Sequence, residues 1–205
     1  MTNFNLENNF GEIIVGIDEV GRGTLAGPVV AAAVYIKRSL WKKFLKKYPD
    51  ISKINDSKKI SKKFRKKLYK ILIKIVSFGI GAASVKEIEE KNILQASLIA
   101  MERAYQSLKV EADFILVDGI NAPKINANIE TIKNGDNKSI SIASASIIAK
   151  VIRDNLMKKL SYKYPEFFWN KNSGYGTKDH INKIKIFGIT PHHRKSFKPI
   201  TKMLE

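Results

Sequence analysis

Residues 12–36 read EIIVGIDEVGRGTLAGPVVAAAVYI, two apolar runs on either side of a glycine-rich segment. Short apolar runs bounded by glycine and proline are typical of buried β-strands. Residues 12–17 and 29–36 are therefore predicted to be strands joined by the turn at residues 21–27. Because the connection is short, the two strands are expected to pair as a hairpin, which favours a mixed sheet over a fully parallel one.

The rest of the chain alternates between helical and strand patterns. Ser61 caps a predicted helix whose apolar residues recur at helical spacing: Phe64, Leu68, Ile71, Leu72 and Ile75. Ser84 and Glu87 are spaced as a capping box and are expected to open a second helix. This helix runs toward Lys109 with a break near Asn92. The other expected elements are strands at residues 77–83, 114–117 and 129–132, a long helix at 141–160 and a short helix in the tail after residue 173. This order predicts an α/β fold.

Composition favours one domain without a membrane span. The chain has 205 residues, of which 44% are hydrophobic, and this is enough for one sizeable core. Its longest apolar stretch, residues 29–36, is far shorter than the roughly 20 residues that a bilayer requires. Residues 1–11 carry no basic region leading into an apolar one, so no secretory signal is expected. These features predict a soluble, cytoplasmic protein.

The residue types limit the kind of metal site. The sequence has no cysteine, which excludes disulfides and thiolate ligands. Its three histidines argue against a conventional zinc site. Any metal would be held by carboxylates, and this favours Mg²⁺ or Mn²⁺.

Basic residues dominate the charge of the chain. Lysine and arginine total 37 against 19 acidic residues, a formal net charge of +18. Such a charge attracts polyanions and speeds their association, so nucleic acid is the favoured partner. A composition biased toward Lys, Ile and Asn would produce the same excess. The charge alone therefore does not distinguish an enzyme from a non-catalytic basic protein.

Carboxylates occur where two of the predicted strands end. Asp18 and Glu19 follow the apolar run at residues 13–17, and Asp118 follows the run at residues 114–117. Adjacent residues on a regular strand point to opposite faces, so Asp18 and Glu19 can share a site only if the strand ends or distorts there. Gly21 and Gly23 allow such a distortion. A single aspartate at a strand end can equally be a turn or cap residue.

A cluster of these acids would have a chemical consequence. Carboxylates that lie together repel one another and stay ionised only beside cations. Paired Mg²⁺ ions can activate a water molecule and stabilise the leaving oxygen in phosphodiester cleavage. Acids at strand ends within a basic protein therefore predict a metal-dependent nuclease.

Several sequence blocks, in order and at matching spacing, resemble ribonuclease HII, the type 2 ribonucleases H. The first is GIDEVGRG at residues 16–23, followed by AGP at residues 26–28. The remaining blocks cover most of the chain: NDSKKIS at 55–61, VDG at 117–119, GD at 135–136, IASASIIAKVIRD at 142–154, SGYGT at 173–177 and HRKSF at 193–197.

The resemblance implies a ribonuclease H-like mixed sheet flanked by helices, in one catalytic domain over residues 1–205 whose segment from about residue 160 is helical. It implies a two-metal endoribonuclease that hydrolyses the RNA strand of RNA–DNA hybrids and cuts at ribonucleotides embedded in duplex DNA, leaving 5′-phosphate and 3′-hydroxyl ends. The family's four acids, both catalytic and metal-binding, map onto Asp18, Glu19, Asp118 and Asp136. Read from the residues alone, Asp136 is a turn residue.

The resemblance also assigns substrate-binding residues. The family's glycine-arginine-glycine element matches Gly21, Arg22 and Gly23, and its tyrosine matches Tyr175. In the family these residues sense the ribose 2′-hydroxyl at an RNA-to-DNA junction, and glycines do let a backbone approach a sugar closely. Lys58 is a candidate phosphate ligand at the edge of the site. From the residues alone, Tyr175 could be a half-buried core aromatic and Lys58 part of a solvated face.

Two positions depart from the family pattern. Thr24 stands where the family often has proline, which is expected to affect the rigidity of the turn more than the chemistry. Asn134 stands where a lysine is common, so one phosphate contact is expected to be missing. Neither change involves the four acids.

Other charged and aromatic residues receive mostly structural interpretations. Lys150 and Arg153 are expected to face the duplex. His192 and His193 are expected to be structural or peripheral, because a metal can generate the nucleophile. Trp41 and Trp169 are expected to be packing residues. The cations of one helix are expected to form an exposed polar side: Lys62, Lys63, Arg65, Lys66, Lys67 and Lys70.

Two alternatives stay open beside the leading hypothesis of a monomeric endoribonuclease. A ribonuclease HIII normally carries an extra N-terminal substrate-binding domain and lacks the element matched by Gly21, Arg22 and Gly23. A non-catalytic basic nucleic-acid-binding protein would explain the net charge but not the acids at two strand ends. Whether magnesium converts binding into cutting would distinguish these classes.

Overall fold

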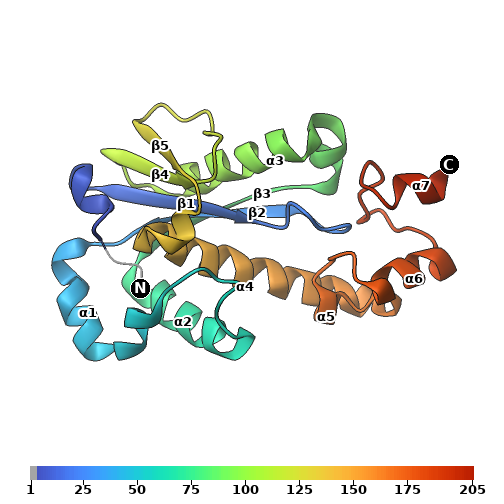
Figure 1. Ribbon diagram of the computed structural model, residues 1–205, viewed down its shortest axis with the longest axis horizontal. Coiled ribbons are helices and arrows are strands. Elements are labelled where there is room, and N and C mark those ends of the chain that lie inside the picture. Colours follow the sequence, from blue (N-terminus) through green and yellow to red (C-terminus); the bar gives the residue numbers. More distant parts are fainter. Residues whose placement is uncertain (1–3) are drawn as a thin grey trace.

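The fold is built on a five-stranded sheet, seen in a computed structural model that describes residues 4–205 (Figure 1). The strands are β1 (Ile14–Val20), β2 (Val29–Tyr35), β3 (Ser77–Ala83), β4 (Phe114–Asp118) and β5 (Ile129–Ile132). They lie in the order β3-β2-β1-β4-β5. β1 and β3 run antiparallel to β2, whereas β4 runs parallel to β1 and to β5. The predicted mixed sheet and its opening hairpin are confirmed.

Helices connect and cover these strands. They are α1 (Trp41–Lys47), α2 (Lys62–Ile75), α3 (Val85–Leu108), α4 (Ile140–Lys163), α5 (Trp169–Asn172), α6 (Lys178–Phe187) and α7 (Thr201–Leu204). Short 3-10 turns lie between them: η1 (Glu7–Asn9), η2 (Arg38–Leu40), η3 (Pro49–Lys53), η4 (Gly135–Asn137) and η5 (Pro165–Phe167). Across residues 4–205, none of the helices combines the length and the apolar content needed to cross a bilayer.

The predicted helix starts are confirmed in detail. The Ser61 hydroxyl accepts a hydrogen bond from the Phe64 amide at 3.2 Å at the start of α2. Ser84 and Glu87 form the full capping box of α3. Asn92 has a φ of 65°, which interrupts α3 at the predicted break, and its side chain caps the amides that follow. The sequence predicts these features because each depends on residues only two or three positions apart.

The two faces of the sheet are covered by different helices. α2 and α4 pack on one face through a core cluster that includes Val20, Ala32 and Val34. α3 packs on the other face through a cluster that includes Val15 and Ile17. Side chains alternate along a strand, so Asp18 points to the α4 face and Glu19 to the α3 face.

A third core cluster joins the C-terminal helices to the β1–β2 loop. It includes Leu25 and Ala26 of that loop, Met157 of α4, and Trp169 of α5. Figure 1 shows α5, α6 and α7 beyond the end of the sheet at which the β1–β2 loop lies. Trp169 is fully buried and Trp41 packs edge-on against Phe4, so both predicted packing roles are confirmed.

Three expectations differ from the structure. β1 does not end before Asp18 but continues to Val20, because its pairing with β2 holds through Val20 and Val30. α1 was not predicted, since its lysine-rich sequence shows no clear apolar repeat. Arg65 is buried rather than exposed on α2, because its guanidinium reaches back to donate to the carbonyl of Ser57.

Candidate active site

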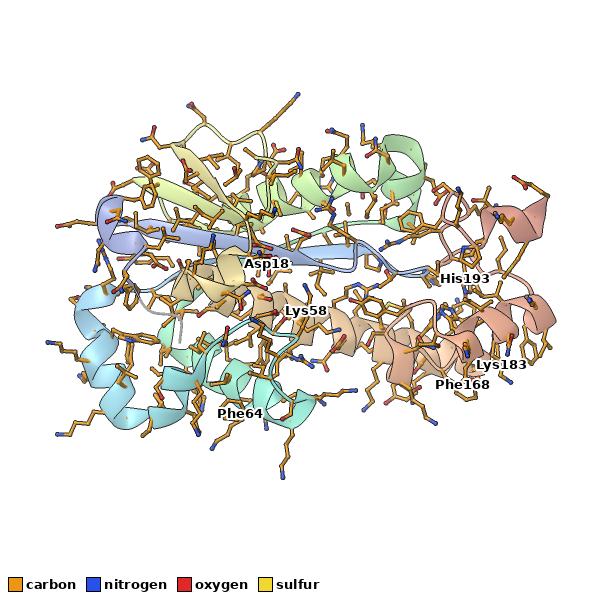
Figure 2. The ribbon with its side chains drawn as sticks, in the orientation of Figure 1. Asp18, Lys58, Phe64, Phe168, Lys183 and His193 are labelled. Atoms are coloured by element: carbon orange, nitrogen blue, oxygen red, sulfur yellow. The ribbon has the colours of Figure 1, made fainter. Side chains whose placement is uncertain are left out.

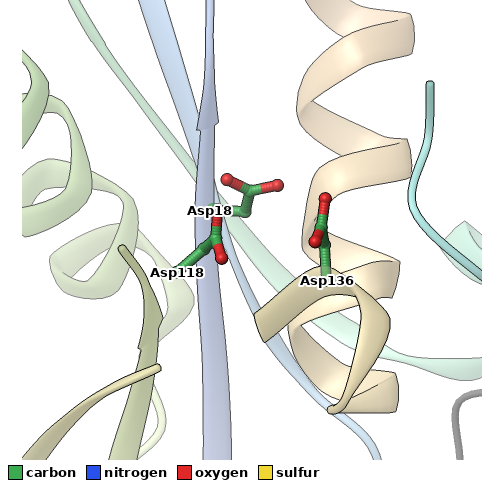
Figure 3. Close-up of side chains that lie close together, drawn as sticks. All are labelled: Asp18, Asp118 and Asp136. Atoms are coloured by element: carbon green, nitrogen blue, oxygen red, sulfur yellow. The ribbon is translucent and has the colours of Figure 1, made fainter. Parts of the chain in front are cut away.

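Three aspartates from separate parts of the sequence meet at one edge of the sheet. One carboxylate oxygen from each of Asp18, Asp118 and Asp136 lies within 4.8 Å of the other two (Figure 3). Asp18 comes from β1, Asp118 from the end of β4, and Asp136 from η4. A site of this kind depends on the parallel pairing of β1 and β4, which brings both acids to the same end of the sheet.

A tight turn brings Asp136 to the two strand residues. The amide of Gly135 donates a hydrogen bond of 2.6 Å to the Asp118 carboxylate, which ties the turn to the end of β4. An added Cβ at Gly135 would lie 2.6 Å from the terminal methyl group of Ile142, so a larger residue would require that side chain to shift. Asn134 has a left-handed backbone with a φ of 56°. Asparagine tolerates that conformation better than lysine does, which gives a physical reason for this departure from the family pattern.

Asp18 lies in the most buried part of this cluster. Burial raises its pKa well above the ordinary value, and the neighbouring carboxylates of Glu19 and Asp118 raise it further. A hydrogen bond from Ser146 of α4 opposes the increase. The amide of Glu19 also donates to the Asp18 carboxylate at 2.7 Å. The protein thus holds Asp18 in place without supplying enough positive charge to neutralise it.

Glu19 is set apart from the other three acids by the regular geometry of β1. It forms an ion pair of 3.6 Å with Arg22 and does not join the group of three aspartates. Burial raises the pKa of Glu19, Arg22 opposes the increase, and Asp118 adds to it. The charge of Asp118 therefore affects Glu19, which lies on the α3 side of the sheet. Asp18 and Asp136 are close to Asp118 on the α4 side.

Asp136 borders a second charged group that the sequence argument did not single out. Its pKa is raised to about 6, first by burial and then by the carboxylates of Asp56 and Asp118. Asp56 is buried and lies in the NDSKKIS block, in which Lys58 was the only predicted site residue. Burial alone would lower the pKa of Lys58, but Asp18, Asp56 and Asp136 together raise it. Figure 2 shows Asp18 and Lys58 near the middle of the view.

The donor set of this cluster fits a divalent cation. Asp18, Asp118 and Asp136 provide oxygen ligands alone, which suits Mg²⁺ and Mn²⁺. Burial and the repulsion of neighbouring carboxylates raise the pKa of Asp18 and of Asp136, and a bound cation would offset the repulsion. A cavity of about 210 Å³ is lined by Asp118, Arg22 and residues of α3, so Asp118 can be reached from the α3 side of the sheet.

The residues matched to junction sensing lie on exposed loops. The side chain of Arg22 is 46% exposed, and Tyr175 is 38% exposed, which excludes a fully buried core role for the tyrosine. Lys150 lies 5.4 Å from the centre of the Tyr175 ring and pairs with Asp154 at 2.8 Å. An added Cβ at Gly23 would meet no atom within 4 Å, so its open side faces free space.

The prediction that Arg153 faces the duplex is wrong. It is fully buried, and its guanidinium donates to backbone and hydroxyl oxygens of neighbouring loops. The prediction failed because a long helix that packs on the sheet buries one side over its whole length. An arginine on that side is retained only if its donors find acceptors.

The histidines belong to the packing of the C-terminal helices, as predicted. Figure 2 places His193 toward those helices, away from Asp18. His180 Nδ1 lies 2.8 Å from the Tyr175 carbonyl, which can only accept, so Nε2 of His180 is free to accept from Trp169 at 3.0 Å. His193 Nδ1 accepts from the Thr190 amide at 2.9 Å. Burial lowers the pKa of His193 to about 3 and also lowers the pKa of His180. The rings of His180 and His193 are therefore neutral structural groups at neutral pH.

The chain is similar to known proteins over nearly its whole length. Residues 15–200 match the family model described as Ribonuclease HII. The chain is 50% identical over 201 residues to a Ribonuclease HII of Wolbachia sp. subsp. Drosophila simulans (strain wRi), and the match covers 98% of both chains.

Solved structures show the same architecture. The ribonuclease H2 from Pyrococcus horikoshii OT3 is 28% identical, with a TM-score of 0.71 over 93% of this chain and 96% of that one. Bst-RNase HIII, solved in complex with Mn²⁺, shares the fold at 18% identity, with a TM-score of 0.74 over 96% of this chain and 71% of that one.

Proposed function

Because the chain belongs to the ribonuclease HII family, we propose that it hydrolyses the RNA strand of RNA–DNA hybrids and cuts duplex DNA at embedded ribonucleotides. It is a metal-dependent endoribonuclease with a ribonuclease H-like fold. The family match and its extent support neither of the two alternatives, a ribonuclease HIII or a non-catalytic basic protein. The match over residues 15–200 also supports treating the chain as one catalytic domain with a helical C-terminal segment.

The observation that carries this proposal is the meeting of three aspartates within 4.8 Å in a protein of net charge +18. An acidic pocket alone would repel a phosphodiester. A basic protein draws the polyanion in, and cations held by the pocket would then neutralise the scissile phosphate locally.

We propose Asp18, Glu19, Asp118 and Asp136 as catalytic residues and ligands of Mg²⁺ or Mn²⁺. When bound, such cations would neutralise developing charge and lower the pKa of water, so that hydroxide is available to attack a phosphodiester at neutral pH. The amides of Gly135 and Glu19 hold Asp118 and Asp18 in fixed orientations. Cleavage between the ribose 3′-oxygen and phosphorus would leave the proposed 5′-phosphate and 3′-hydroxyl ends.

We propose that Gly21, Arg22, Gly23, Tyr175 and Lys58 bind the substrate. Gly23 offers an open backbone position, and the side chains of Arg22 and Tyr175 are exposed. A backbone that approaches the sugar closely can distinguish ribose from deoxyribose through the 2′-hydroxyl. Lys58 lies close enough to Asp18 and Asp136 for their carboxylates to raise its pKa. Its positive charge at the edge of the site suits a phosphate contact.

We also propose an oligomeric state, a location and a cellular role. The enzyme acts as a monomer, it works in the cytoplasm where its DNA substrates are, and it serves the removal of ribonucleotides during DNA replication and repair. Sedimentation of the purified protein with and without a hybrid duplex would test the first statement directly.

One assay tests the proposed function. Duplex DNA with a single ribonucleotide, an RNA–DNA hybrid and an all-DNA duplex would be incubated with the protein in Mg²⁺, Mn²⁺ or EDTA. We expect cutting of the first two with either metal, with 5′-phosphate ends, and no cutting in EDTA. Cutting of the all-DNA duplex at the same rate, or cutting in EDTA, would refute the proposal.

A further inference from the structure

Two fully buried guanidinium groups have no carboxylate partner among residues 4–205. Arg153 and Arg194 are both 0% exposed. No ion pair involves either of them within residues 4–205. Buried charges are normally paired, because removing an ion from water is costly. The local structure must therefore compensate these two charges in another way.

Arg194 is compensated by the backbone of the β1–β2 loop. Its Nη2 donates to the carbonyls of Gly21 and Gly27, both at 2.7 Å, and its Nη1 donates to the carbonyl of Arg22 at 2.8 Å. Its Nε donates to Gly27 at 3.0 Å, and its own amide donates to the carbonyl of Leu25 at 2.8 Å. One side chain from the C-terminal tail thus holds both ends of the loop.

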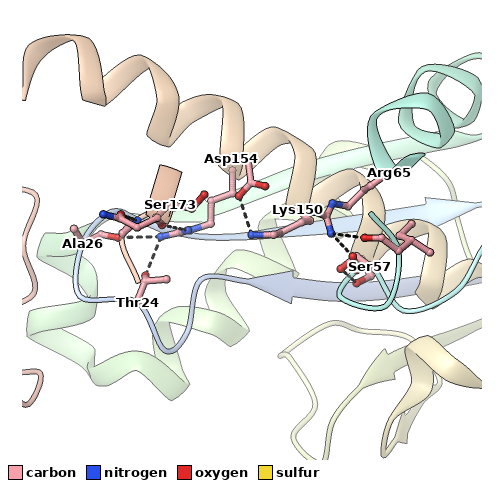
Figure 4. Close-up of polar contacts among 12 residues, drawn as sticks. Thr24, Ala26, Ser57, Arg65, Lys150, Asp154 and Ser173 are labelled. Carbon is pink, nitrogen blue, oxygen red and sulfur yellow. Dashed lines mark hydrogen bonds and ion pairs between the residues drawn. The ribbon is translucent and has the colours of Figure 1, made fainter. Parts of the chain in front are cut away.

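Arg153 joins this loop to the segment before Tyr175. Its guanidinium donates to the carbonyls of Pro28 and Ala26 at 2.9 Å and to the carbonyl of Ser173 at 2.8 Å. It also donates to the Thr24 hydroxyl at 2.8 Å. Figure 4 shows Thr24, Ala26 and Ser173 around this one guanidinium. The amide of Leu25 adds a direct link by donating to the carbonyl of Gly174 at 2.8 Å.

Sequence details of the loop match these contacts. Gly21 has a φ of 99°, and an added Cβ there would overlap Arg153 Nε. The Thr24 hydroxyl accepts from Arg153 and donates to the carbonyl of Gly21 at 3.0 Å. A proline at residue 24 could form neither bond. In this chain, Thr24 therefore provides rigidity to the turn through hydrogen bonds rather than through a ring.

We propose that Arg153 and Arg194, with Thr24, are positioning residues that hold Gly21, Arg22 and Gly23 at a constant distance from Tyr175. This inference rests on the proposed function, in which both elements contact the same ribose. A guanidinium has donors in a rigid planar fork, so several acceptors are fixed relative to one another at once. Neither arginine touches the substrate; each acts through the loops that do.

The test uses variants of the full chain on two substrates. Arg153→Lys and Arg194→Lys keep the charge but lose the fork, and Thr24→Val loses only the hydroxyl. Leu72→Ala, in the fully buried core of α2, serves as a control that lowers stability far from these loops. For each variant we would measure the melting temperature, its rise with Mg²⁺, and the ratio of cleavage rates on single-ribonucleotide DNA and on a long hybrid.

We expect the rate ratio to fall by about tenfold or more in the two lysine variants, because a small misplacement of binding groups costs up to about a hundredfold in rate. Thr24→Val should lower it less, and Leu72→Ala should leave it unchanged at a comparable loss of melting temperature. The rise with Mg²⁺ should be the same in all variants. Equal ratios in the lysine variants and Leu72→Ala would overturn the proposal.

The design separates two kinds of failure. If the unmodified protein cuts neither substrate with Mg²⁺ or Mn²⁺, the proposed function fails. If it cuts both but the ratio does not respond to the variants, only the positioning role fails. Should the lysine variants not fold, Thr24→Val decides: an unchanged ratio in that variant overturns the proposal, and a lowered ratio with a normal rise with Mg²⁺ supports it.

Discussion

The aspartates Asp18, Asp118 and Asp136, which are buried or half-buried, and the buried arginines Arg153 and Arg194 are two groups of like charge with different surroundings. Burial raises the pKa of Asp18 and lowers the pKa of Arg194 to about 9, so the same physical cause acts on both. The arginines, however, donate eight hydrogen bonds to loop oxygens. The aspartates receive few donors and repel one another.

This difference separates a ligand site from a structural clamp. Charges whose hydrogen-bonding capacity is filled by the protein lower the energy of one loop conformation and have nothing left to offer a ligand. Charges left without donors or counter-ions destabilise the protein until a cation arrives. The distinction predicts opposite responses when a member of each group is removed.

The largest expected effect is on catalysis. Asp18→Asn or Asp118→Asn should lower cleavage of single-ribonucleotide DNA by about a thousandfold or more, since losing a metal ligand removes several kcal/mol of charge stabilisation and about 1.4 kcal/mol is worth tenfold. Duplex binding in the absence of metal should persist. Glu130→Gln, which removes an exposed carboxylate on β5, is the matched control and should cut normally. Near-normal turnover in either aspartate variant would contradict the assignment.

The next effect is on stability and has opposite signs in the two groups. Arg194→Met should lower the free energy of unfolding by about 3 kcal/mol or more, because buried carbonyls left without donors cost about 1–3 kcal/mol each. Asp136→Asn should instead raise the melting temperature of the metal-free protein at neutral pH, since it removes a repelling charge. Thermal unfolding in EDTA would measure both. Destabilisation by both variants would show that the two groups do not differ in this way.

Two glycines sharpen the comparison between clamp and ligand surface. Gly21→Ala should cost about 1–3 kcal/mol of stability, because the added methyl group meets Arg153 and overpacking is costly. Gly23→Ala should keep wild-type stability, since the methyl group meets open space. It should nevertheless lower cutting at a single ribonucleotide by about tenfold relative to a long hybrid. Denaturant unfolding and paired rate measurements would check both; a normal rate ratio in Gly23→Ala would argue against close approach of substrate there.

The smallest effect is the pH dependence of metal-free stability. The pKa of Asp136 is raised from 3.8 to about 6. A raised pKa means that the folded protein binds the proton more tightly than the unfolded chain. The resulting stabilisation is complete below about pH 4 and is lost as the pH rises through about 6.

The histidines change stability with pH in the opposite direction to Asp136. The effect of Asp136 is therefore measured as a difference in melting temperature between a variant and the unmodified protein. His193 has a lowered pKa of about 3, and protonation of the unfolded chain removes stability as the pH falls below 6.5. The melting temperature of Asp136→Asn minus that of the unmodified protein should therefore increase between pH 4 and pH 7. We expect a few degrees, since about 1 kcal/mol corresponds to roughly 2–4 °C at this size. Saturating Mg²⁺ should remove or reverse the difference; a flat difference in EDTA would contradict it.

Local pattern accounted for most of the secondary structure. The strands β2, β4 and β5, the caps of α2 and α3, and the interruption at Asn92 all follow from residues within a few positions of one another. The end of β1 did not, because Asp18 and Glu19 look like residues that follow a strand. Pairing with β2 keeps them inside it.

Charged residues on helices were the least predictable part. Arg65 and Arg153 were expected on the surface because arginine is usually exposed. Both are buried, and their guanidinium groups donate to carbonyls five or more residues away along the chain. Acceptors so distant in sequence leave no periodic signal, and so no local pattern could have distinguished these two arginines from the exposed lysines beside them.

The sequence by itself determined the α/β class, the charge that favours a polyanionic substrate, and, through family resemblance, four acids and a sensing element. Only the tertiary structure decided which acids meet. Parallel pairing of β1 and β4 and the turn at Gly135 bring Asp18, Asp118 and Asp136 together, while strand alternation sends Glu19 to the other face. The physical reason is that side-chain direction follows from strand register and helix packing, and the β1–β4 register depends on contacts between residues one hundred positions apart.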